Sequence, residues 1–156
     1  MQRIGLDARG GDWAALHHVT DDGLSKDVCI AADPIGGLSL RADSDVLEIR
    51  AIDRSWHLHP GVRGNMKISI GSYEHVFPMQ YGDKHMLAAA VPAESMKDLL
   101  EAMGKGQKAV LTFMGKNTQK TVSLKDTQKV LNAFRNCVES SGMANLGSAP
   151  DSNSPF

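Results

Sequence analysis

The chain has two cysteines, Cys29 and Cys137, and they stand far apart in its 156 residues. Cys29 lies in an apolar stretch with the character of a β-strand, and Cys137 lies in a region with helical spacing of apolar residues. We predict that the two are joined, because both lie on apolar elements and the chain has no other cysteine. Such a bond would tie an early strand to the last helix and would indicate an oxidising compartment, periplasmic or secreted.

The first residues of the chain do not resemble a signal peptide. The segment Met1–Asp7 lacks the apolar core that a secretory signal needs. An exported protein would therefore have lost its signal, and a cytoplasmic protein with two free thiols is the alternative. No stretch approaches about 18 uninterrupted apolar residues, so we expect no transmembrane helix.

Composition narrows the class of partner. Basic and acidic residues nearly balance, 17 against 18, and the net charge is −1. No basic run stands out, so a nucleic-acid partner is disfavoured. A protein partner remains, and we expect no cofactor.

Short alternating segments dominate the first two thirds of the chain. The clearest is Met66–Ile70, in which apolar and polar residues alternate as on a half-buried strand. Strands are expected over residues 13–19, 26–31, 38–41, 47–51, 66–70, 73–79, 85–91, 108–114 and 120–124.

Two segments have helical periodicity instead. After Pro92, apolar residues recur at helical spacing as far as Met103, and Gly104 marks the end. A second helix follows Ser123, which we expect to cap it with Asp126 three positions on. The apolar face of that helix comprises Val130, Leu131, Phe134, Cys137 and Val138.

These elements predict a mainly β fold with two helices. We expect an antiparallel β-sandwich or a barrel-like arrangement, closed by the C-terminal helix. Residues 1–10 are expected to form a loose lead-in, residues 11–139 a single β-rich domain, and residues 140–156 a disordered tail rich in Ser, Gly, Pro and Asn.

Histidine spacing suggests one chemical site. On a strand, His57 and His59 would project from the same face and could both reach one metal ion. A third ligand would come from His75, His85 or Glu74. The alternative is that His57 and His59 are polar residues on an exposed edge beside Trp56.

Other catalytic motifs are not evident. The sequence has no Gly-x-Ser-x-Gly elbow, and neither cysteine lies in a reactive motif. Trp56 is either a core residue or, with His57 and His59, part of a binding edge. The residues therefore favour a protein that is not an enzyme.

The second half of the chain resembles the periplasmic proteins of the invasion-associated locus B type. The resemblance rests on the segment from Leu87 to Pro92 running into a helix that ends at Gly106, on the strands 109–113 and 122–126, and on a terminal helix. As an arrangement of elements it extends over residues 11–138. That family usually carries further cysteines, so its disulfide pairing does not transfer. The resemblance implies an exported β-rich binding protein and transfers no catalytic residue.

Three functional hypotheses follow. The first is an exported, non-enzymatic protein of the bacterial envelope that binds another macromolecule. The second is an immunity or inhibitor protein that blocks a toxin or a hydrolase. The third is a metal-dependent enzyme that uses the His57 and His59 pair.

Overall fold

The computed structural model describes residues 3–146. The described part contains ten strands and two helices. The strands are β1 Ile4–Gly10, β2 Trp13–Val19, β3 Lys26–Asp33, β4 Leu38–Asp43, β5 Leu47–Ile52, β6 Arg63–Ile70, β7 Tyr73–Asp83, β8 Met86–Val91, β9 Lys108–Phe113 and β10 Thr118–Ser123. The helices are α1 Ala93–Lys105 and α2 Gln128–Ser140.

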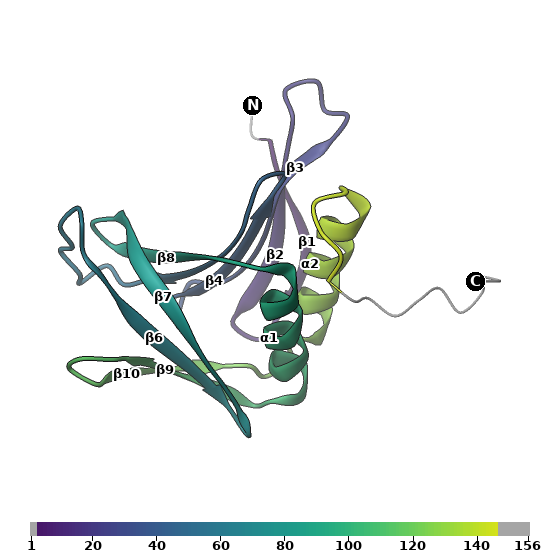
Figure 1. Cartoon of the computed structure of the whole chain (residues 1–156). Coiled ribbons are helices and arrows are strands. Elements are labelled where there is room, and N and C mark those ends of the chain that lie inside the picture. Colours follow the sequence, from purple (N-terminus) through teal and green to yellow (C-terminus); the bar gives the residue numbers. More distant parts are fainter. Residues whose placement is uncertain (1–2, 147–156) are drawn as a thin grey trace.

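All ten strands belong to one antiparallel sheet, in the order β1-β2-β3-β4-β5-β8-β7-β6-β9-β10. Figure 1 shows the sheet bending, so that β6, β7, β9 and β10 turn away from the plane of β2–β5, with α1 and α2 side by side at one end. The sheet is not closed, because β1 and β10 form its edges. The predicted mainly β, antiparallel fold with two helices is confirmed.

One hydrophobic core joins the two parts of the bent sheet. The core contains the buried residues of β4 and β5 from one part of the sheet. It also contains those of β6 and β7 from the other part. Met66 and Ile68 are fully buried while Lys67 between them is not, as the alternation in the sequence predicts. Trp13 ties β2 to the far edge of the sheet, because its indole nitrogen donates to the carbonyl oxygen of Ser123 at 2.8 Å.

Both helices bury the predicted faces. In α1 these are Met96, Leu99, Leu100 and Met103, and in α2 they are Val130, Leu131, Phe134, Cys137 and Val138. Helix α2 contacts β1, β2 and β3.

The predicted start of α2 is wrong. Ser123 is the last residue of β10, and the N-cap is Thr127, whose hydroxyl donates to the carbonyl oxygen of Leu124 at 2.9 Å. Asp126 has a φ of 59° and lies in the connection between strand and helix. The strand therefore includes Ser123, which the sequence pattern assigns to the cap, and the helix begins further along the chain.

The expected loose lead-in differs from the structure, because Ile4–Gly10 forms the edge strand β1. It pairs with β2 along its length, with a bulge between Leu6 and Ala8. Gly10 is required at the turn that follows, since a side chain there would collide with the carbonyl oxygen of Asp126. The single domain over residues 11–139 stays a prediction.

The structure also departs from the expected tail over residues 140–146. Ser140 ends α2, and Leu146 is only 1% exposed and belongs to the core. The sulfur of Met143 lies 3.8 Å from that of Cys29. The prediction of disorder over 147–156 falls outside the described residues.

We expect Leu146→Ala to lower the free energy of unfolding by about 1.5–3 kcal/mol, the value for burying a leucine side chain. The matched control is Leu24→Ala, because Leu24 is 84% exposed. Denaturant melts of the two variants would measure the difference. Equal stabilities for the two would mean that the segment 143–146 does not dock in solution.

Candidate functional site

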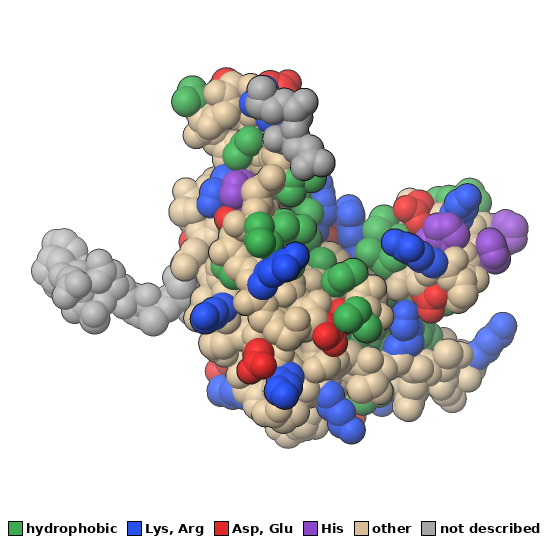
Figure 2. All heavy atoms as spheres, turned by 180° about the vertical axis from the view of Figure 1, so that it is seen from behind, with side chains coloured by type: hydrophobic (Ala, Val, Ile, Leu, Met, Phe, Trp, Pro, Cys, Tyr) green, Lys and Arg blue, Asp and Glu red, His purple; other side chains and the backbone are tan. Residues whose placement is uncertain are grey.

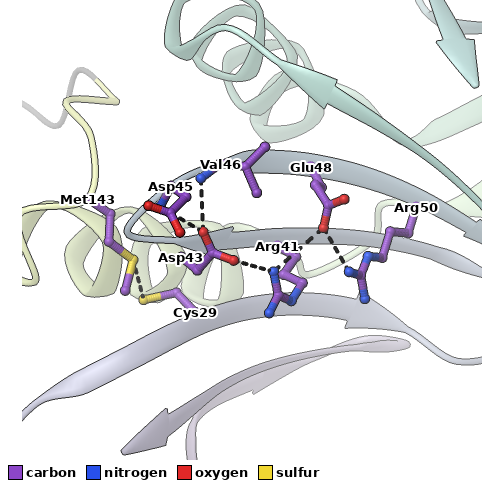
Figure 3. Close-up of polar contacts among 8 residues, drawn as sticks. All are labelled: Cys29, Arg41, Asp43, Asp45, Val46, Glu48, Arg50 and Met143. Carbon is purple, nitrogen blue, oxygen red and sulfur yellow. Dashed lines mark hydrogen bonds and ion pairs between the residues drawn. The ribbon is translucent and has the colours of Figure 1, made fainter. Parts of the chain in front are cut away.

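The two predicted cysteines form a disulfide between β3 and α2. Cys29 and Cys137 are 0% and 3% exposed, their Cα atoms are 6.0 Å apart, and 108 positions separate them in the chain. Met143 covers the Cys29 sulfur (Figure 3). The predicted pairing is confirmed, and the burial of the bond gives it a structural role rather than a catalytic one.

Trp56 lies in the loop of residues 53–62, between β5 and β6, and is half-buried. Its ring meets the edge of Phe113 from β9, with centroids 5.3 Å apart and an angle of 88° between the planes. The carbonyl oxygen of Trp56 accepts a hydrogen bond of 2.7 Å from Nδ1 of His85. The end of β9 and the turn between β7 and β8 therefore hold this loop residue in place.

A groove of about 340 Å³ opens beside this aromatic pair. We call it the Trp56 groove and define it by its lining: Asp53, Trp56, Leu58, Val62, Leu87, Phe113, Met114, Lys116, Thr118 and Lys120. Six of these side chains are apolar or aromatic, and the charged ones are two lysines and one aspartate. Figure 2 shows basic, acidic, histidine and hydrophobic side chains together on a projecting part of the surface.

Lys120 from β10 is fixed above the groove by two partners. Its ammonium group lies 3.3 Å from Oδ2 of Asp53 and donates to the carbonyl oxygen of Ile52 at 3.3 Å. It also lies 5.5 Å from the centroid of the Trp56 ring, within the range of a cation–π contact.

Asp53 stays ionised because several donors surround it. The hydroxyl and the amide of Ser55 donate to Oδ1 at 2.6 and 2.9 Å. These bonds, with a smaller contribution from Lys120, lower the pKa of Asp53 to about 2. The charge of Lys120 is therefore balanced, and Lys116 supplies an unpaired positive charge among the described groove residues.

The predicted metal pair does not lie on a strand. His57 and His59 belong to an exposed loop, because Pro60 and Gly61 form a turn just before β6. The rings of His57 and His85 are 6.1 Å apart, and residues 3–146 contain no group of three side chains able to hold a metal ion. The prediction that His57 and His59 project from the same face of a strand is therefore wrong.

The other proposed ligands have different neighbours. The ring of His75 lies against Phe77, with centroids 4.5 Å apart. Glu74 is 4.0 Å from the ammonium group of Lys67. Of the proposed binding residues, only Trp56 lines the groove.

Sequence reasoning missed Phe113, Lys120 and Asp53. The pairing of β6 with β9 sets Phe113 opposite Met66, and β10 follows from β9. Only this register brings residues from positions 53, 113 and 120 together. In the sequence, the available sign of this groove was Trp56.

Neither helix of the described chain has the length and apolarity to cross a bilayer.

Comparisons with known proteins give a fold-level result. No protein-family model matches the sequence, and no curated protein does. Among solved structures, the chain is similar to invasion associated protein B from Bartonella henselae, with a TM-score of 0.38 and 13% identity. The match covers 83% of this chain and 96% of that one. The matched protein is of the invasion-associated type that the sequence resemblance names.

Proposed function

We propose that this chain is an exported, non-enzymatic protein of the bacterial envelope that binds a protein partner in the Trp56 groove. The groove carries the proposal, because it joins an aromatic pair to a positively charged rim. Tryptophan is among the side chains most often responsible for binding energy at protein interfaces.

The disulfide supports the location. Bonds of this kind persist in oxidising compartments and are rare in the reducing cytosol. The bond between Cys29 and Cys137 joins β3 to α2. It is buried and is therefore part of the folded core. This chemistry supports an envelope or secreted location.

The charge of the groove indicates what the partner presents. Two lysines and one aspartate give its lining a net charge of +1 (2 − 1). An apolar side chain would fill the space beside Trp56, and a neighbouring carboxylate would pair with Lys116. An inhibitor or immunity protein would use the groove in the same way, with a hydrolase or toxin as its partner.

A random peptide library displayed on phage tests this. We expect enriched peptides to carry an apolar or aromatic residue next to Asp or Glu. Trp56→Ala should weaken their binding about tenfold or more, as loss of an interface anchor does. Fluorescence anisotropy of a labelled peptide would measure both affinities.

Lys116→Glu separates binding from folding, because Lys116 is exposed in the turn between β9 and β10. Lys116→Glu should weaken the binding of the same peptides. Lys129→Glu, on the exposed surface of α2, should leave their affinity unchanged. Peptides that bind the Trp56 and Lys116 variants as well as they bind the unaltered protein would refute the groove as the site.

A further inference from the structure

We propose that a second cavity, next to the Trp56 groove, binds a guanidinium or ammonium group through the carboxylate of Asp33. We call it the Asp33 cavity. It has a volume of about 530 Å³ and shares Asp53 and Lys120 with the groove. The proposal goes beyond protein binding, since any molecule that carries such a group could occupy the cavity.

Asp33 ends β3 and is 2% exposed. Its Oδ1 accepts hydrogen bonds from the amides of Ile35 and Gly36, at 2.8 and 2.9 Å. Its Oδ2 is buried and has no hydrogen-bond partner among the described residues. A buried carboxylate oxygen without a donor is costly, so a ligand that supplies one gains binding energy.

The next hairpin contains the same arrangement with the partner in place. Asp43 ends β4, and its Oδ1 accepts from the amides of Asp45 and Val46 at 2.8 and 2.9 Å. Its Oδ2 accepts a hydrogen bond of 2.7 Å from the guanidinium of Arg41 (Figure 3). The two turns differ in two respects: a guanidinium satisfies the second oxygen of Asp43 and nothing in the described chain satisfies that of Asp33, and Asp33 is the more deeply buried of the two.

The lining of the Asp33 cavity carries two acidic residues, Asp33 and Asp53, and two basic ones, Arg54 and Lys120, so its formal charges balance. Lys120 is engaged by Asp53 and by the carbonyl oxygen of Ile52, so its charge is already balanced. Arg54 lines the cavity but is exposed and forms no ion pair among the described residues. Asp33 is therefore the carboxylate in the cavity without a bound cation, and a group with N–H donors suits its free oxygen.

The walls suit the aliphatic stem of such a ligand. Pro34, Ile35 and Ile52 line the cavity, and the two isoleucines are 77% and 39% exposed. Apolar side chains at the mouth would cover the methylene groups of an arginine, a lysine or an alkyl amine. The source of the cation is either a small molecule or a side chain of a protein.

Titration with n-butylguanidinium, n-butylammonium and neutral 1-butanol, followed by amide NMR, tests the proposal. The amides of Ile35 and Gly36 should shift saturably with the two cations and not with butanol. A blocked tripeptide Gly-Arg-Gly distinguishes the source. Tighter binding of the peptide than of n-butylguanidinium points to a protein side chain, and the reverse points to a small molecule.

Asp33→Asn keeps an oxygen for the two turn amides, removes the charge and replaces the free acceptor oxygen with an NH2 group, which only donates. It should weaken cation binding about tenfold or more, the effect of losing a charged hydrogen bond. Asp43→Asn makes the same change in the equivalent turn and should leave binding unaltered. Two results would overturn the proposal: equal binding by the Asp33→Asn variant, or no saturable shift with either cation.

Discussion

Replacing both cysteines, as Cys29→Ala with Cys137→Ala, should lower the free energy of unfolding by about 4–5 kcal/mol, the chain-entropy value for a loop of about 100 residues. The bond spans 108 positions, so without it the unfolded chain gains much conformational freedom. It also fixes α2 against β3, and α2 contacts the first three strands. Equilibrium unfolding in urea would measure the loss.

The unaltered protein with its disulfide reduced is the matched control, because it keeps both sulfur atoms in the core. If the loop accounts for the effect, reduction should cost nearly as much as the double substitution. Thiol titration of the unfolded, unreduced protein should find no free thiol. Two reactive thiols would remove both the stabilisation and the argument for export.

The central strands could be predicted because their pattern is local. In β6, Met66, Ile68 and Ile70 face the core and the residues between them do not, so period two is visible without knowledge of the fold. Both helices were visible for the same reason, through their apolar faces. In each of these elements, the spacing of the apolar residues identifies the face that is buried in the core.

The edge strand β1 could not be recognised in this way. Ile4 and Leu6 occupy alternate positions, but both are largely exposed in this edge strand, so their pattern does not define a face that packs on the core. Gly5 lies under the ring of His17, where a side chain would not fit. The reason for this glycine is therefore a residue of the next strand, which the local sequence does not reveal.

The two cavities were hidden for a related reason. Asp33 looked like an ordinary turn residue, as does Asp43, and both do make that turn. Only the structure shows that Arg41 reaches one of them and that no described residue reaches the other. Turn chemistry is local, whereas the surroundings of the second carboxylate oxygen of Asp33 include Val122 of β10, which is distant in the sequence.

Phe134→Ala should cost about 3–5 kcal/mol, the range for a fully buried phenylalanine. Phe134 is 1% exposed on the inner face of α2, between Leu131 and Val138 in the same core cluster. The remaining void would lie beside the element that carries Cys137, so packing contacts of the helix would be lost while the disulfide stayed intact. Denaturant melts under non-reducing conditions isolate the packing contribution.

Asn136→Ala is the appropriate control, because Asn136 is exposed on the same helix and should change stability by no more than about 0.5 kcal/mol. The neighbouring Arg135 is a poorer control, because it is half-buried and its Nε is buried without a hydrogen-bond partner among the described residues. Burial also lowers the pKa of its guanidinium. Replacing Arg135 would therefore change burial and charge together. The contrast between Phe134→Ala and Asn136→Ala tests the register of α2 directly. Equal losses for those two variants would place the helix in a different rotation and would remove Cys137 from the face that meets β3.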